Sequence, residues 1–295
     1  MPGTNPLAPA GRRLLVPALV ALAIAAAIAV GIWLQYGERQ AMDTRYTAGS
    51  SAADRIDISA SVQRVDATGR ELTLRLLVTP HGALAEEGGL APAQDLVLQT
   101  SSSVRGDLSF KAHNRISAVD VPVTLTGGSI TDYPFDAYEA VIEFSAQQGG
   151  RNVPVRMALS NSDSLFTARA ETVDDPDAAV LDLSLARSNS VLIFAVFMMA
   201  AMWALAVAVL VATWFLVTRR KGLVWPALGW MAATLFALAA FRNTAPGSPP
   251  IGCILDYIAF LWVEPVIAFC VVTAVAAGVR AESAAEKESQ ESKNP

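Results

Sequence analysis

Four long apolar segments constrain the fold of this chain more than any other feature of its sequence. They cover residues 14–34, 191–217, 223–241 and 257–279. A helix needs about 20 apolar residues to cross a hydrocarbon layer about 30 Å thick. The first three segments contain no charged residue, and the fourth contains only Glu264. The sequence therefore predicts four transmembrane helices.

The first apolar segment has features of both a signal peptide and a permanent anchor. Arg12 and Arg13 precede it, which is compatible with either. Its apolar run is about 21 residues long, whereas the apolar region of a signal peptide has about 7–15 residues. No small-x-small cleavage site follows it, because the next residues are Gln-Tyr-Gly-Glu. We interpret the segment as an uncleaved anchor.

Basic residues predict the orientation of the spans. Lys and Arg gather in residues 1–13, in the loop 218–222 and in the tail 280–295, whereas the loop 242–256 contains only Arg242. Short loops rich in Lys and Arg stay in the cytoplasm. We therefore predict a multi-pass protein of the plasma membrane with both termini in the cytoplasm and the loop 242–256 outside. The two terminal segments are poor in large apolar residues, so we predict that they are disordered.

Residues 35–190 fall between the first two spans and are predicted to form an extracytoplasmic domain. Apolar residues alternate with polar ones over 56–62 and 72–78, and Asp66–Gly69 between them is a turn sequence. Further alternating runs follow at residues 96–98, 104–110, 119–125, 138–144, 153–159 and 181–185. About eight short strands favour an antiparallel β-sandwich, with a barrel as the alternative. The predicted fold class is an α+β membrane protein with four transmembrane helices and an external antiparallel β-sandwich.

The charge and motif content of this domain exclude several functional classes. Between Glu38 and Arg187 there are 21 acidic and 13 basic residues, a balance that does not suit nucleic acid. His81 and His113 have no neighbours at metal-ligand spacing. The sequence has no nucleophile, phosphate-binding or zinc-protease motif. It predicts no enzyme, no metal site and no cofactor.

An aromatic turn is the most distinctive short string of the domain. It contains Tyr133, Pro134, Phe135, Asp136 and Tyr138. Proline and aspartate favour turns, and the aromatic rings are either buried in such a turn or docked on the helices or a partner. We expect Tyr133, Phe135 and Tyr138 to lie against the loop 242–256, as a junction between domain and membrane.

Glu264 is the one charged residue inside a predicted span. A carboxylate in hydrocarbon faces the helix bundle or water and needs a polar partner. Arg242, at the outer end of the third span, is the nearest cation in sequence on that side of the membrane. We therefore predict an intramembrane polar pair of Glu264 with Arg242, or with the adjacent Asn243 or a water molecule.

Three groups of residues carry a resemblance over nearly the whole chain. They are Tyr133-Pro134-Phe135-Asp136 with Tyr138; Arg187 followed by Phe194, Phe197, Met198, Met199 and Trp203; and Arg242-Asn243, Pro246-Gly247, Pro249-Pro250, Gly252, Asp256, Trp262 and Glu264. With them the chain resembles the domain of unknown function 4436 family of bacterial multi-pass membrane proteins. The resemblance implies one anchor, an external β-rich domain and three closing helices. It implies no activity.

These observations support three functional hypotheses. The first is a non-enzymatic cell-envelope protein that presents its β-sandwich outside the membrane for binding or assembly. Its partners would be the lipid bilayer and an envelope protein or a second copy of the chain. The second is a subunit of a channel or transporter with Glu264 near the ion or proton path. The third is an enzyme that acts on a lipid or envelope precursor at the outer surface.

Overall fold

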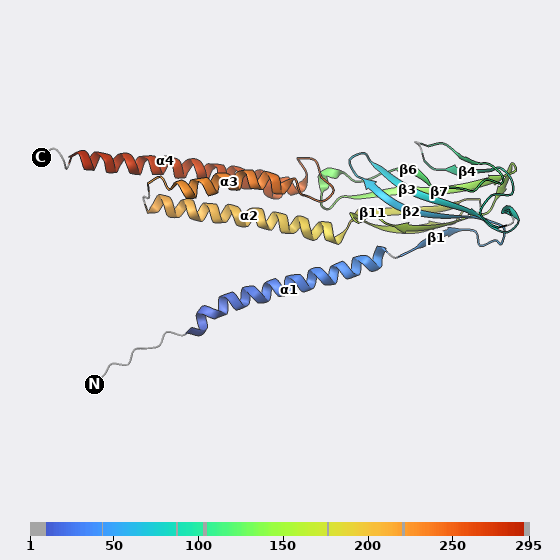
Figure 1. Ribbon diagram of the computed structural model, residues 1–295, viewed down its shortest axis with the longest axis horizontal. Coiled ribbons are helices and arrows are strands. Elements are labelled where there is room, and N and C mark those ends of the chain that lie inside the picture. Colours follow the sequence, from blue (N-terminus) through green and yellow to red (C-terminus); the bar gives the residue numbers. More distant parts are fainter. Residues whose placement is uncertain are drawn as a thin grey trace, which may run out of the picture.

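The computed structural model describes residues 10–42, 44–86, 88–102, 105–175, 177–219 and 222–291. The molecule is elongated, with a β-sandwich at one end and helices at the other (Figure 1). Three helices, α2, α3 and α4, lie side by side and continue the long axis of the sandwich. The first helix, α1, diverges from them (Figure 1).

Two sheets form the sandwich. The first has the order β1-β9-β2-β3-β6, with β1 Tyr46–Gly49, β9 Val155–Asn161, β2 Ile56–Asp66, β3 Glu71–Pro80 and β6 Val119–Thr124. The second has the order β10-β11-β7-β4-β5, with β10 Phe166–Val173, β11 Ala179–Arg187, β7 Ala137–Gln148, β4 Leu96–Thr100 and β5 Leu108–Phe110; β8, Arg151–Val153, pairs with β7. One apolar core lies between the sheets, because alternate residues of the long strands β2, β3 and β7 are buried.

The predicted β-rich domain is confirmed, with differences in detail. Strand pairs are antiparallel except β2 with β9, which run parallel. The described residues contain eleven strands instead of about eight. The prediction missed β1, β8 and β10, because β1 and β8 have only four and three residues and β10 has large apolar residues only at its two ends. Of the run predicted at 104–110, Val104 lies outside the described residues and β5 covers only Leu108–Phe110.

Three of the four predicted spans lie within longer helical segments, whereas α3 is about as long as its predicted span. They are α1 Ala10–Met42, α2 Asn189–Thr218, α3 Trp225–Arg242 and α4 Leu261–Glu291, with a π-helical turn at Asp256–Phe260 before α4. Single turns of 3-10 helix lie at Gly82–Leu84 and Ile130–Asp132. Ser188 caps α2, because its hydroxyl accepts a hydrogen bond from the Val191 N–H.

These bounds correct three predicted segments. Residues 35–42 continue α1 and are not part of the sandwich. Residues 10–13 are helical, and residues 1–9 of the predicted N-terminal segment lie outside the described part of the chain. Residues 280–291 continue α4, where a disordered tail was predicted, because alanine, glutamate and lysine are strong helix formers even where apolar residues are few. The rest of the tail, 292–295, is outside the described residues, as are Arg220 and Lys221 of the loop 218–222.

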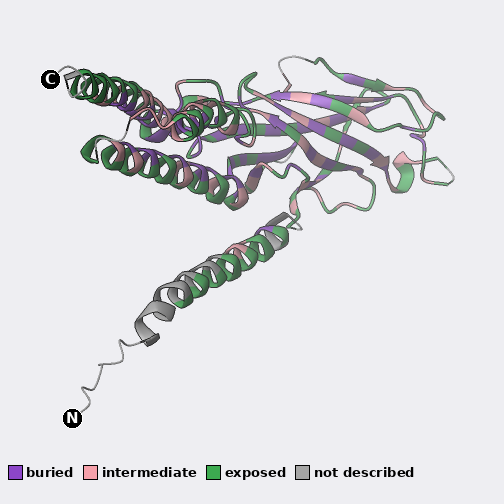
Figure 2. Ribbon diagram, turned by 60° about the vertical axis from the view of Figure 1, so that its left-hand side comes forward, coloured by how far each residue is buried: buried purple, intermediate pink, exposed green. Residues whose placement is uncertain are grey.

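Two of the predicted spans are supported by the helices of the structure. Among the described residues, two helices are long and apolar enough to cross a membrane, Asn189–Thr218 and Asp256–Gln290. The helix α3 has only 18 residues, and it includes Pro226 near its start and Arg242 at its end. Several side chains of α1 lie outside the described set. The outward faces of α2 and α4 are largely exposed (Figure 2).

Candidate functional site

A buried ion pair lies where the sandwich meets the helices. Arg187 is the last residue of β11, and Asp136 directly precedes β7. The Arg187 Nε donates to Asp136 Oδ1 at 2.9 Å, and Nη2 donates to Oδ2 at 3.0 Å. The two side chains are 2% and 0% exposed. Because Ser188 then caps α2, this pair fixes the strand-to-helix connection.

Aromatic rings enclose the Arg187 guanidinium. Its Cζ lies 4.1 Å from the ring centroid of Phe166 and 5.1 Å from that of Tyr133. Cation–π contacts of this kind are strongest when the cation is removed from water. The Tyr138 hydroxyl donates to Asp136 Oδ2 at 3.0 Å. Burial, together with the nearby Asp136 carboxylate, raises the pKa of Tyr138.

Tyr133 joins this site to the helices. It is fully buried and belongs to the helical core, which it shares with Val191, Cys253 and Leu255. Its carbonyl oxygen accepts a hydrogen bond from the Leu255 N–H at 3.3 Å. Burial raises the pKa of Tyr133 to about 12. Its hydroxyl has no hydrogen-bond partner among the described residues.

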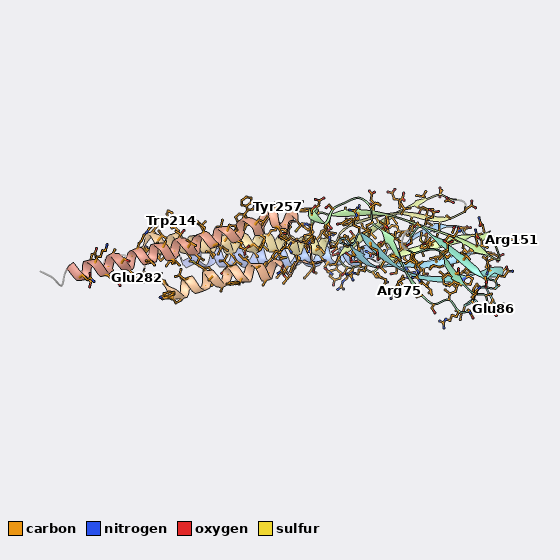
Figure 3. All side chains as sticks on the ribbon, turned by 90° about the horizontal axis from the view of Figure 1, so that it is seen from above. Arg75, Glu86, Arg151, Trp214, Tyr257 and Glu282 are labelled. Carbon is orange, nitrogen blue, oxygen red and sulfur yellow. The ribbon has the colours of Figure 1, made fainter. Side chains whose placement is uncertain are left out.

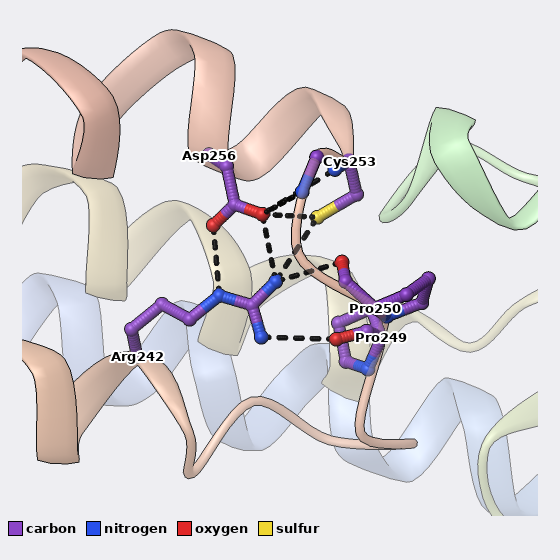
Figure 4. Close-up of polar contacts among 6 residues, drawn as sticks. Arg242, Pro249, Pro250, Cys253 and Asp256 are labelled. Atoms are coloured by element: carbon purple, nitrogen blue, oxygen red, sulfur yellow. Dashed lines mark hydrogen bonds and ion pairs between the residues drawn. The ribbon is translucent and has the colours of Figure 1, made fainter.

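A second buried ion pair fixes the loop between α3 and α4 (Figure 4). The Nε of Arg242 donates to Asp256 Oδ1 and its Nη2 donates to Oδ2, both at 2.7 Å. The remaining donors of the guanidinium reach the carbonyl oxygens of Pro249 and Pro250, each at 2.9 Å. Asp256 Oδ2 also accepts from the Gly252 N–H at 2.7 Å. This network gives the loop 242–256 a defined conformation.

The structure places the aromatic residues of the predicted junction in three environments. Tyr133 lies in the helical core beside the loop 242–256, and Tyr138 is buried in the core of the sandwich. Phe135 is 56% exposed. Pro134 is buried, and Asp136 binds Arg187. One turn therefore supplies a contact to each part of the molecule.

The predicted pair of Glu264 with Arg242 is wrong. Arg242 pairs with Asp256, and Asn243 is exposed at the end of α3. Glu264 is half-buried and makes no hydrogen bond or ion pair within the described part of the chain. The reason is geometric: Asp256 stands at the loop end of the last helix, on the level of Arg242, whereas Glu264 lies two turns further along that helix.

Sequence reasoning missed two of the four charged partners, Arg187 and Asp256. Both stand at the boundary of a long apolar segment. Opposite charges at the two ends of one short loop between apolar segments are the signal that would have found the pair of Arg242 with Asp256, whereas Asp136 lies inside the sandwich and carries no such signal for Arg187.

The two buried ion pairs are suited to a structural role, in which they hold the sandwich and the loop 242–256 in place. Both carboxylates are occupied by guanidinium groups, which leaves neither as a general base. Burial raises the pKa of the Cys253 thiol, so it is not an activated nucleophile. No group of His, Cys, Asp and Glu in the described residues is arranged to hold a metal ion.

Comparisons with known proteins divide the chain at this junction. A family described as domain of unknown function (DUF4436) matches residues 46–185, which is the sandwich. A second, described as domain of unknown function (DUF8686), matches residues 187–281, which begins at Arg187 and covers α2, α3 and most of α4. A search of curated proteins finds no matching relative.

Proposed function

The chain belongs to the DUF4436 family, and from this premise we propose that it is a multi-pass membrane protein that presents its β-sandwich, rigidly seated, outside the cytoplasm for binding or assembly. In this proposal all four helices cross the plasma membrane and both termini are cytoplasmic. The sandwich meets an envelope protein or a second copy of the chain.

The buried pair of Arg187 with Asp136 is the observation that carries the proposal. A domain on a flexible tether needs no buried charge at its attachment point, and desolvating two charges has a large free-energy cost unless the geometry is good. Here only Ser188 separates β11 from α2, and the pair is enclosed by Tyr133 and Phe166. Such an attachment fixes the orientation of the sandwich relative to the helices.

Exposed aromatic residues support a bilayer around the helices. Trp33, Tyr36, Tyr257 and Trp262 are exposed near the sandwich, and Trp214 and Trp225 near the other end of the helices. Figure 3 labels one residue of each group, Tyr257 and Trp214. Tryptophan and tyrosine are enriched at both membrane–water interfaces, so the two groups mark the expected positions of the headgroups.

The alternative, a channel or transporter subunit with Glu264 near the ion or proton path, has less support. A groove between α2 and α4 runs past the part of α4 that contains Glu264. It is lined mostly by apolar side chains, such as Leu210, Trp214 and Phe269. Ion flux in liposomes containing the purified chain tests this alternative. A flux that Glu264→Gln abolishes would favour it over a binding protein.

Thiol labelling tests the proposed topology. In a background with Cys253 and Cys270 replaced by alanine, Arg151→Cys places a thiol at the far end of the sandwich and Glu286→Cys places one near the end of α4. Both positions are exposed. An impermeant maleimide should label only the first in intact cells and both after permeabilisation. Labelling of the second alone, or of both, in intact cells would overturn the topology.

A further inference from the structure

A polar pocket of about 210 Å³ lies at the helix-proximal end of the sandwich, beside the junction. Three connections enclose it: the turn between β2 and β3, the segment between β9 and β10, and the loop between α3 and α4. Its polar lining is Arg64, Asp66, Thr68, Asp163, Arg187 and Ser248. The pocket therefore exists only where the sandwich is seated on the helices.

A β-bulge in β2 sets the side chains of one wall. The register with β3 shifts between Val62 and Arg64, and the burial pattern changes phase there, so that Val65 is buried and Arg64 is exposed. Bulges re-aim side chains in this way. The Arg64 guanidinium makes no hydrogen bond or ion pair with any described residue. It is available to a ligand.

Asp163 and Asp66 supply carboxylates to the same pocket. Asp163 is only 7% exposed, and its oxygens accept from the N–H groups of Val65 at 2.6 Å and Leu165 at 2.7 Å. Asp66 accepts from the Gly69 N–H at 2.8 Å. Both carboxylates are held in place by backbone hydrogen bonds, and each oxygen can accept more than one.

Arg187 contributes a buried donor. Its Nε and Nη2 bind Asp136, whereas Nη1 has no hydrogen-bond partner among the described residues, although the side chain is 98% removed from solvent. Nη1 lies beside Gly247, where an added Cβ would come within 2.7 Å of it. Gly247 also has φ +77°, a value that favours glycine. The glycine leaves Nη1 open toward the pocket that both residues line.

We propose that this pocket binds a phosphate ester that carries a primary amine, the chemistry of phosphoethanolamine. Two arginines and two aspartates line it, so the site matches a zwitterion better than a simple anion. Arg64 and Arg187 Nη1 donate charge-assisted hydrogen bonds to the phosphate. The carboxylates of Asp66 and Asp163 accept from the ammonium group.

The source of this ligand is either a free phosphoethanolamine or the headgroup of a membrane lipid. The lipid source rests on the proposed function, because it requires the pocket to lie at the outer membrane surface. The ligand chemistry does not depend on that topology, because it follows from the lining residues alone. A choline group is disfavoured, since its quaternary nitrogen has no N–H to donate to the aspartates.

Equilibrium binding to the purified full-length chain in detergent tests the ligand. Titration calorimetry with phosphoethanolamine, phosphocholine and inorganic phosphate should show phosphoethanolamine binding at least tenfold more tightly than the other two. The lipid source is tested in nanodiscs that contain either phosphatidylethanolamine or phosphatidylcholine. The protein is extracted from each, and the number of lipid molecules that stay bound to it is compared. If phosphatidylethanolamine is retained but free phosphoethanolamine does not bind, the pocket is a lipid headgroup site. If free phosphoethanolamine binds, the ligand is soluble.

Arg64→Ala is the decisive variant, with Arg75→Ala as the matched control. Arg64 is exposed, so its loss leaves the fold intact, and losing one charge-assisted hydrogen bond should weaken binding about tenfold or more. Arg75 pairs with Asp120 on the surface of the sandwich, so its loss should leave binding unchanged. Equal binding of phosphoethanolamine and phosphocholine, an equal effect of both variants, or no binding in either arm would overturn the proposal. Thiol labelling remains a separate test of the topology.

Discussion

Tyr133 combines two properties at the point where the sandwich meets the helices. Its carbonyl oxygen and ring are engaged by Leu255 and Arg187, but its buried hydroxyl has no partner among the described residues. A buried hydroxyl without a hydrogen bond carries a desolvation cost. The residue therefore stabilises the junction through its ring and backbone.

The phenylalanine variant separates these contributions. Tyr133→Phe keeps the ring and removes the hydroxyl, so the free energy of unfolding near pH 8 should stay equal or rise by about 1 kcal/mol. Denaturant unfolding in detergent measures it. Tyr46→Phe is the control, because the Tyr46 hydroxyl donates to the Ala168 carbonyl oxygen and its loss should be destabilising. A clear loss of stability in Tyr133→Phe would show that the hydroxyl has a partner.

The same variant has a consequence at alkaline pH. The pKa of Tyr133 is raised to about 12, against about 10 for a tyrosine in the unfolded chain. Below pH 10 both states keep the proton, and between pH 10 and 12 the unfolded state loses it first, so stability falls as pH rises. Tyr133→Phe should make that fall shallower without removing it, because the pKa of Tyr138 is raised too.

At the scale of elements, the connection of β11 to α2 is where the sandwich is attached to the helices. The strand ends at Arg187 and the helix begins at Asn189. Asp136, at the start of β7, holds this connection from the neighbouring strand, since β7 and β11 are paired. The ion pair thus links three elements.

A double-mutant cycle tests this link. Asp136→Ala and Arg187→Ala should each lower the free energy of unfolding by about 3–5 kcal/mol, because each leaves a buried charge unpaired. The double variant should lose less than the sum of the two. Strict additivity would mean that the two residues do not interact.

The exposed pair of Arg75 with Asp120 is the control for this cycle. It has the same residue types, with side chains 53% and 49% exposed. Water and salt screen such pairs, so the corresponding variants should change the unfolding temperature little and show no coupling.

At the scale of the whole molecule, α1 meets the unit formed by the sandwich and the other helices near its C-terminal end. It diverges from α2 along most of its length (Figure 1). Near its end, Gln35 Oε1 and Glu38 Oε2 lie within hydrogen-bond distance of the Ser190 hydroxyl, and Glu38 Oε2 also accepts from the Ser190 N–H at 3.2 Å. A carboxylate at the start of a helix is favourable because of the helix dipole.

Cleavage of the purified protein tests how much this contact contributes to stability. A protease site inserted after Met42, cut in detergent, should leave the unfolding temperature of the remaining unit nearly unchanged. A site between Ser248 and Pro249 is the control, because it cuts the loop that the network of Arg242 with Asp256 organises, and its cleavage should lower the unfolding temperature strongly. Equal losses at both sites would show that α1 is an integral part of that unit.

The sequence by itself determined the class of most segments. Apolar runs and period-two alternation are local properties, and they predicted the helices and most strands, including the β2–β3 hairpin. Local patterns contain no information about which distant side chains meet. Asp136 and Arg187 are 51 positions apart, and the choice of Asp256 over Glu264 as the partner of Arg242 depends on the height of each along its helix. Only the packing of the sandwich on the helices decided these pairs and the pocket beside them, because a charge removed from water needs an opposite charge within hydrogen-bond distance.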